Sequence, residues 1–249
     1  MAAAAPNHSP PQTLSHLLSL LPPTLPIAPH SPDASLTPLI SAPQFHPALE
    51  ALLHLLNSDL PSAHFLCRHM QAPPAVEGML LHAILHRMEG DFENARAWLR
   101  SVGKDKGDDG DGVGEGGRHS GTGGIVERGL EGHGHRDQGR GVRLLKFVGS
   151  GTSESWAEGN FNGDGDVDPV RRAIGLVDAV ETFRKHGEGD EGALRKALEY
   201  ETARLLQWCK EEFGEERWED ASVAWVRPGE DVRKIGEDMV SGGKGWREF

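Results

Sequence analysis

Two histidines four residues apart, His82 and His86, are the clearest candidates for chemistry in this sequence. On a helix this spacing puts both side chains on one face, where their imidazoles could hold a transition-metal ion. His64, Glu77 and Glu89 are the nearest residues that could supply a third ligand. The segment lacks the glutamate of the HExxH zinc motif, and histidines at this spacing also occur in ordinary helix packing. A metal site and structural histidines therefore both stay open, and the spacing alone favours the structural interpretation.

The helices that must position these histidines belong to an internal repeat between residues 46 and 103. Residues 48–71 match residues 80–103 at an offset of 32 residues without a gap. A match sustained at this period is typical of stacked helical hairpins, each of which needs its neighbour to bury an apolar face. The identical pairs are Leu49/Leu81, Ala51/Ala83, Leu53/Leu85, His54/His86, Asp59/Asp91, Ala63/Ala95 and Arg68/Arg100.

The second unit, EGMLLHAILHRMEGDFENARAWLRSV, resembles a tetratricopeptide repeat. Ala83 and Ala95 stand at the positions where that family keeps small residues, and Gly90-Asp91-Phe92 matches its turn. Helices that cross closely need such small side chains. The period of 32 departs from the family's period of about 34 residues. The segment is also similar to a group of uncharacterised fungal proteins that share an ILHRxEGDFxNAxxW stretch. The resemblance implies an all-α fold of antiparallel hairpins stacked in one domain.

The resemblance also implies a function, because the first helix of each tetratricopeptide hairpin lines a concave binding surface. The favoured hypothesis is a non-catalytic protein that binds a peptide or protein segment there. Arg87 would then pair with a carboxylate of the partner and Glu77 with a basic group. The alternative hypothesis is a metal-dependent enzyme that uses His64, His82 and His86. A third possibility is a scaffold in which the Gly-rich insertion is the working part. The predicted partner-binding residues are Glu77, Leu80, Ile84, Arg87, Ala48 and Leu52.

Composition narrows the partners that this chain of 249 residues can take. Its formal net charge of −12 disfavours nucleic acids and anionic membrane surfaces, which require a basic protein surface, and suits a basic protein partner. The glycine-rich stretch 242–245 lacks a preceding strand and a following helix, so no phosphate-binding loop and no cofactor is predicted. No apolar run approaches the length of a membrane span.

The two cysteines, Cys67 and Cys209, are far apart in sequence and each falls in a predicted helix. This usage is typical of a reducing compartment, and we expect both to be small buried side chains. The N-terminus shows no basic residue ahead of an apolar run, which disfavours a secretory signal. We therefore expect a cytoplasmic or nuclear protein.

Composition also divides the chain into four segments. Residues 1–43 hold ten of the 16 prolines and are predicted to be disordered, although Leu14–Leu21 could form a short helix that docks on the core. Residues 44–103 carry the two hairpins. Residues 104–168 form a Gly- and Asp-rich insertion, predicted to be disordered around an apolar island at 142–148. Residues 169–249 are expected to add helices to the same domain, including a degenerate third hairpin near residues 209–225 and a terminal helix at 230–239.

Overall fold

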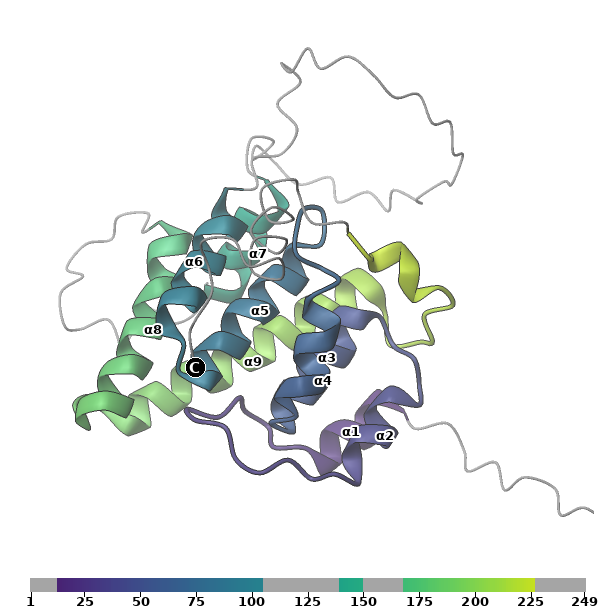
Figure 1. The fold of residues 1–249 in the computed structure, drawn as a ribbon, viewed down its shortest axis with the longest axis horizontal. Coiled ribbons are helices and arrows are strands. Elements are labelled where there is room, and N and C mark those ends of the chain that lie inside the picture. Colours follow the sequence, from purple (N-terminus) through teal and green to yellow (C-terminus); the bar gives the residue numbers. More distant parts are fainter. Residues whose placement is uncertain (1–12, 105–138, 150–167, 227–249) are drawn as a thin grey trace, which may run out of the picture.

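The computed structural model describes residues 13–104, 139–149 and 168–226, which are coloured in Figure 1. Over these ranges the chain forms nine α-helices, one 3-10 helix and no strand, so the predicted all-α class is confirmed for them. The helices are α1 (Leu14–Leu20), α2 (Leu36–Ser41), α3 (Pro47–Leu56), α4 (Leu60–Cys67), α5 (Val76–Glu89), α6 (Phe92–Gly103), α7 (Arg140–Gly149), α8 (Pro169–His186), α9 (Glu191–Phe213) and the 3-10 helix Ala221–Ala224.

Helix α5 is the centre of the fold. It packs against α3, α4, α6, α7 and α8, and every one of its residues except Glu89 is buried. Figure 1 shows α5 with α6 and α8 on one side and α3 and α4 on the other. A helix that is buried all round requires partners on every side. The chain supplies them by returning α7, α8 and α9 from far along the sequence.

The two hairpins predicted from the repeat, α3–α4 and α5–α6, share the geometry of their turns. Asp59 and Asp91 each cap the second helix of their hairpin through a side-chain oxygen. The two residues that precede these aspartates, Ser58 and Gly90, both have a left-handed backbone, with φ of 55° and 92°. The sequence offset of 32 residues therefore corresponds to a repeated local structure. The small residues of the matched pairs, Ala51, Ala63, Ala83 and Ala95, are all buried.

The N-terminal segment corrects one prediction. Residues 13–43 were expected to be disordered, but they carry α1 and α2 and contribute leucines to the core. Leu14 and Leu17 are buried, as the alternative of a docking helix at 14–21 requires. The prolines lie mostly between the helices, where a missing amide donor costs little, and the spaced leucines supply the burial that offsets ordering. Residues 1–12 lie outside the described residues.

The insertion and the C-terminal segment need similar corrections. The apolar island at 142–148 lies within α7, whose Leu144 and Leu145 are buried in the core, so this part of residues 104–168 is ordered. Residues 105–138 and 150–167 lie outside the described residues. The predicted third hairpin is wrong, because α9 continues to Phe213 and the described segment after it forms only a 3-10 turn at Ala221–Ala224. The helix predicted at 230–239 also lies outside the described residues.

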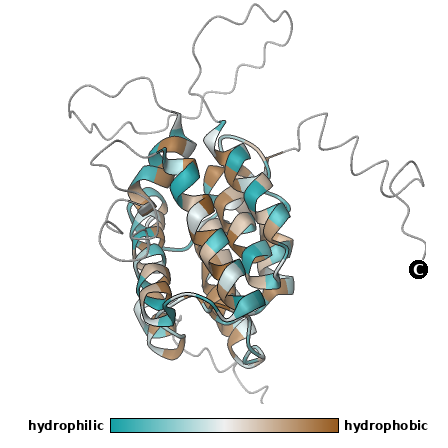
Figure 2. Ribbon diagram, turned by 90° about the vertical axis from the view of Figure 1, so that its left-hand side faces the viewer, coloured by the Kyte–Doolittle hydropathy of each residue, from teal (hydrophilic) through white to brown (hydrophobic). Residues whose placement is uncertain are grey.

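Most helices carry both apolar and polar residues, as the mixed colours along each ribbon in Figure 2 show. This mixture is expected of helices that bury one face and leave the other to solvent. None of the described helices combines the length and the apolar character that crossing a membrane would require.

Candidate metal centre

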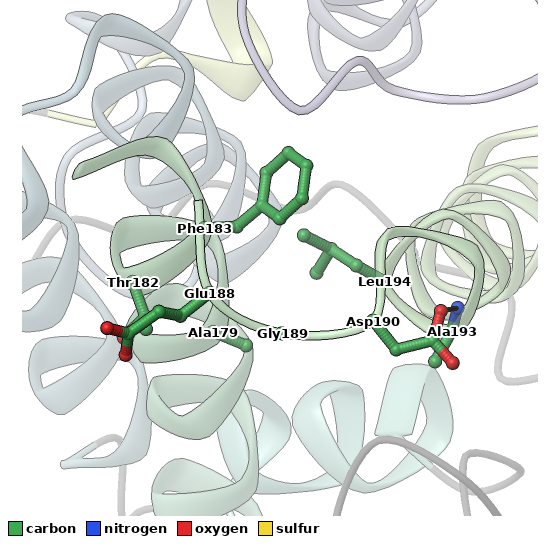
Figure 3. Close-up of a pocket in the computed structure, with 8 residues that line it drawn as sticks. All are labelled: Ala179, Thr182, Phe183, Glu188, Gly189, Asp190, Ala193 and Leu194. Atoms are coloured by element: carbon green, nitrogen blue, oxygen red, sulfur yellow. Dashed lines mark hydrogen bonds between the residues drawn. The ribbon is translucent and has the colours of Figure 1, made fainter. Parts of the chain in front are cut away.

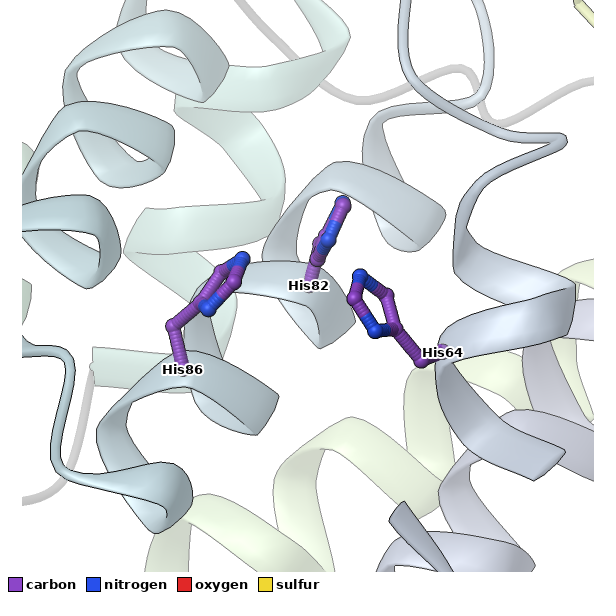
Figure 4. Close-up of side chains that lie close together, drawn as sticks. All are labelled: His64, His82 and His86. Carbon is purple, nitrogen blue, oxygen red and sulfur yellow. The ribbon is translucent and has the colours of Figure 1, made fainter. Parts of the chain in front are cut away.

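Three histidines from two helices converge in the described structure. His64 extends from α4 toward His82 and His86, which lie one turn apart on α5 (Figure 4). The three residues can each offer a ring nitrogen such that the three atoms lie within 4.8 Å of one another. The ring centroids are 4.9 Å apart for His64 and His82, 5.7 Å for His64 and His86, and 4.8 Å for His82 and His86. The three residues of the alternative hypothesis are thus brought together.

His82 is the most deeply buried member of this cluster, with 3% of its surface exposed. Neither Nδ1 nor Nε2 has a hydrogen-bond partner within residues 13–104, 139–149 and 168–226, although both atoms are shielded from solvent. One face of the ring stacks on Trp98 of α6, with centroids 4.4 Å apart and planes 26° apart. Burial, reinforced by His86, His64 and Arg68, lowers the pKa of His82 to about 3. His82 is therefore neutral near pH 7 and presents two unpaired polar atoms, a costly arrangement in a protein interior.

His86 is held in one tautomer by its neighbours. Its Nδ1 lies 3.0 Å from a carboxylate oxygen of Glu89, and its Nε2 lies 3.3 Å from the side-chain amide nitrogen of Asn94. An amide nitrogen can only donate, so Nε2 accepts and Nδ1 carries the proton that it donates to Glu89. A carboxylate bound to the far nitrogen of a histidine is the usual outer support of a metal-ligating imidazole. Nε2 therefore carries the lone pair of the ring, which the amide of Asn94 occupies in this structure and would have to release to a metal ion.

His64 forms the outer edge of the cluster. It is half-buried, and burial together with the charge of Arg68 lowers the pKa of its imidazole. Arg68 is exposed and stands four residues after His64, so both point from the same side of α4. The carboxylate of Glu89 opposes this effect on His64. The open side of the cluster is thus bordered by one cation and one anion.

This arrangement fits a first-row transition metal better than a hard cation such as Mg²⁺. Imidazole nitrogens are ligands of zinc, copper, iron and nickel, whereas magnesium and calcium take oxygen ligands. Zinc binds histidine nitrogens at about 2.0–2.1 Å, which places two nitrogens of a tetrahedral site roughly 3.3 Å apart. The present separations reach 4.8 Å, so the rings would have to rotate inward by small amounts to bind an ion. Three protein ligands would leave a fourth position open.

Glu77, an early candidate for the third ligand, does not reach this cluster. Its carboxylate accepts hydrogen bonds from Arg140 Nη2 at 2.7 Å and from the indole nitrogen of Trp208 at 2.8 Å. Glu89 takes part, but through His86 rather than as a member of the three-nitrogen cluster. The third nitrogen comes from His64, eighteen residues before His82 on a different helix.

The predicted partner-binding surface lies inside the protein. All six of its residues are buried: α7 and α8 pack against α5, and α9 packs against α3, which carries Ala48 and Leu52. Arg87 donates to both carboxylate oxygens of Glu201 in α9, at 2.9 and 2.5 Å, and Leu80 packs beside Leu145 of α7. A partner therefore cannot reach these side chains in this structure. The buried residues are Glu77, Leu80, Ile84, Arg87, Ala48 and Leu52.

A cavity of about 420 Å³ lies elsewhere, at the turn between α8 and α9 (Figure 3). Two carboxylates, Glu188 and Asp190, line it. Asp190 uses one side-chain oxygen to cap α9, accepting from the backbone nitrogens of Gly192 and Ala193 at 2.8 and 3.1 Å. The remaining walls come mainly from the ends of α8 and α9, and the three histidines are not among them. The size of this cavity therefore points to no chemistry, whereas the histidine cluster does.

Asn94 and Trp98 were not identified as site residues from the sequence. Both lie on α6, which follows the turn after α5 and presents them to His86 and His82. Their offsets of eight from His86 and sixteen from His82 cross a turn, so helical periodicity cannot relate them. One sign in the sequence was Trp98, an aromatic residue where the first repeat has Leu66; Asn94 gave no such sign, because the matching residue Ser62 is also polar.

Comparison with other proteins adds no assignment to these observations. No protein-family model, no curated protein and no solved structure matches the chain.

Proposed function

We propose that this protein binds one transition-metal ion of the zinc class at His64, His82 and His86 and is a metal-dependent enzyme. The observation that carries the proposal is the convergence of three imidazoles from two helices, with both ring nitrogens of His82 lacking any hydrogen-bond partner among the described residues. A bound metal would give His82 the partner that the protein itself does not supply. Structural zinc sites have four protein ligands, whereas catalytic sites have three and an open position.

A zinc-class ion in such a site lowers the pKa of its bound water to about 7 or polarises a substrate oxygen, and hydrolysis is the reaction class that both effects serve. The chain's own residues have separate roles. Glu89 orients His86 through Nδ1, and Trp98 closes one side of His82 against water. The amide of Asn94 donates to Nε2 of His86, so it would have to turn away from that nitrogen before an ion could bind there.

The low pKa values of two of the histidines support metal binding near neutral pH. Protonated imidazoles cannot ligate, so a histidine with its ordinary pKa near 6.5 loses affinity in mild acid. Burial lowers the pKa of His82 to about 3, and burial with Arg68 lowers the pKa of His64. His82 therefore stays neutral in weakly acidic solution, and the pKa of His64 is shifted in the same direction.

We also infer that the two hairpins stack as tetratricopeptide-like units. The inference is supported by the repeated turn geometry at Asp59 and Asp91 and by the burial of the matched alanines. We do not extend it to peptide binding, since α7, α8 and α9 cover the residues that would form the concave surface. In this fold the repeat serves to bring His64 of one hairpin against α5 of the next.

The test is the metal content of protein purified without a metal-affinity step, measured by elemental mass spectrometry before and after dialysis against Zn²⁺. The proposal predicts about one ion per chain. His82→Ala and His86→Ala should each abolish this stoichiometry, while His16→Ala, which removes an exposed imidazole from α1, should leave it unchanged. Circular dichroism would show that each variant remains helical.

The proposed site would be refuted if the wild-type protein took up no zinc. It would also be refuted if the His82→Ala variant bound zinc as well as the wild type does. If zinc binds with the predicted dependence on histidines, a screen of ester, amide and phosphoester substrates with the loaded protein would test the enzymatic part. Activity must then disappear with the metal and return when zinc is added back.

A further inference from the structure

A second buried histidine, His54 of α3, also has a ring nitrogen without a hydrogen bond. It is 1% exposed, and Nδ1 lacks a partner with hydrogen-bond alignment among the described residues, although a carboxylate oxygen of Asp59 lies 3.2 Å away. The other ring nitrogen, Nε2, lies 3.4 Å from the hydroxyl oxygen of Ser41. The imidazole of His54 thus lies between Ser41, at Nε2, and Asp59, at Nδ1.

Asp59 is fixed in place for this arrangement. Its Oδ2 accepts from the hydroxyl of Thr37 at 2.7 Å, and its Oδ1 accepts from the backbone nitrogen of Ser62 at 3.3 Å. Partial burial would raise the pKa of Asp59, but the hydrogen bonds from Thr37 and Ser62 outweigh it and lower the pKa. The carboxylate is therefore ionised near neutral pH. Its position favours the tautomer of His54 with a proton on Nδ1, which leaves the lone pair of Nε2 facing Ser41.

Ser41 stands at the exposed end of α2, beside a cavity of about 270 Å³. Aromatic side chains form much of the cavity wall, including Phe45, Phe65 and Trp225. Arg217 and Gln44 line the same cavity, and the side chains of both carry N–H groups. The serine is thus the point at which the buried pair His54 and Asp59 meets a cavity large enough for a small aromatic or aliphatic group.

We propose that Ser41, His54 and Asp59 form a nucleophilic triad that hydrolyses carboxylic esters whose small apolar or aromatic part occupies this cavity. The three residues stand in the order that serine hydrolysis needs, with nucleophile, base and orienting carboxylate in turn. The separations of 3.4 and 3.2 Å are those of a site without substrate, in which such contacts are commonly longer than in the reacting complex. This activity is independent of the metal centre.

In the first half of the reaction, Ser41 Oγ forms a bond to the carbonyl carbon and its proton passes to Nε2 of His54. The ester C–O bond then breaks, and the alcohol leaves with that proton. In the second half, water attacks the acyl-serine, gives its proton to Nε2, and the carboxylic acid leaves as Ser41 regains the proton. Glu50, with a carboxylate oxygen 3.7 Å from Nε2, stabilises the imidazolium formed at each half.

Labelling with a fluorophosphonate tests the proposal, because its phosphorus forms a bond to an activated serine oxygen while fluoride leaves with the serine proton. Intact-mass spectrometry should show one adduct per chain, and peptide mapping should place it on Ser41. Ser41→Ala should abolish the adduct, whereas Ser35→Ala, which removes another exposed hydroxyl near the start of α2, should not. Hydrolysis of p-nitrophenyl butyrate should follow the same pattern.

Asp59→Asn keeps the helix cap of α4 but removes the charge that orients His54, so it should slow labelling at least about a hundredfold. Labelling should be unaffected by EDTA and by His82→Ala, which separates this site from the metal centre. The absence of an adduct on Ser41, or a rate unchanged in a folded Asp59→Asn variant, would overturn the triad and leave the metal proposal untouched. Loss of labelling on metal removal would overturn the claim that this serine site works independently of the metal centre.

Discussion

Nδ1 of His86 donates to a carboxylate oxygen of Glu89 at a distance of 3.0 Å, and this contact leaves the lone pair of the ring on Nε2. Glu89→Gln would remove the charge and weaken the preference for one tautomer. We expect the zinc affinity to fall about 10- to 100-fold, as it does when outer partners of ligating histidines are removed elsewhere. Isothermal titration calorimetry would measure the change.

The matched control for that variant is Glu93→Gln, which changes another acid near the α5–α6 turn that pairs with Arg96 instead of a histidine. Its zinc affinity should equal that of the wild type. Equal affinity in the Glu89→Gln protein would show that His86 does not depend on its carboxylate.

His82 should lower the stability of the metal-free protein, because both of its ring nitrogens are buried and find no partner in the part of the chain that the structure describes. We expect His82→Leu to raise the free energy of unfolding by about 1 kcal/mol or more in the absence of metal, since a buried polar group without a hydrogen bond costs about 1–3 kcal/mol. His86→Leu should have the opposite effect, because the nitrogens of His86 are both hydrogen-bonded. Urea unfolding of the metal-free wild type, His82→Leu and His86→Leu proteins would measure both effects. Equal destabilisation by the two substitutions would contradict the predicted cost of the unpaired His82 nitrogens.

Acid should destabilise the fold partly through His46. Burial, reinforced by the charge of Arg140, lowers the pKa of His46 to about 4, while the unfolded chain keeps a histidine pKa near 6.5. The stability that neutral His46 contributes is therefore complete above pH 6.5 and is lost as the pH falls toward 4. Over this window the loss approaches about 1.4 kcal/mol per pH unit.

His46→Asn isolates this contribution, because asparagine cannot titrate and still accepts at the start of α3, where Nδ1 of His46 accepts from Ala48 at 3.2 Å. The variant should show a shallower decline of unfolding free energy between pH 6.5 and 4, measured by urea unfolding at several pH values. A decline as steep as that of the wild type would mean that other groups carry the acid sensitivity.

The ion pair between Arg87 and Glu201 joins α5 to α9 and is buried on both sides. Arg87→Met should lower the free energy of unfolding by about 3–5 kcal/mol, because it leaves the carboxylate of Glu201 buried without its partner. The double variant Arg87→Met/Glu201→Met should recover most of that loss, since an apolar pair of similar size avoids desolvation of both charges. Thermal melts of the two variants would measure the difference, and a double variant less stable than the single one would contradict it.

Features that depend on neighbours along the chain were predictable from the sequence. The helical period, the paired hairpins and the turns at Asp59 and Asp91 all follow from local propensity and from the 32-residue repeat. The shared face of His82 and His86 follows in the same way from their spacing of four residues. These features rest on contacts between residues that are close in sequence, which the helix geometry fixes.

Features that depend on contacts between distant segments could not be predicted. The acid at Glu77 gave no indication that Arg140, 63 residues later, would cover it, nor did Arg87 indicate Glu201. The burial of Leu14 and Leu17 was not predicted, because prolines interrupt the helical pattern of this segment. An interrupted pattern does not exclude burial of its leucines against another segment. For the same reason Ser41 and His54, thirteen residues apart on different helices, gave no motif.

The most direct test of metal binding by the three histidines is a crystal structure of the zinc-loaded protein with anomalous data collected at the zinc absorption edge. We predict a single strong anomalous peak per chain, at about 2.0–2.1 Å from one nitrogen each of His64, His82 and His86. The rings should have rotated inward from the present separations of up to 4.8 Å. Zinc-loaded crystals with no peak among these three rings, or with zinc only on surface histidines, would contradict the proposed centre.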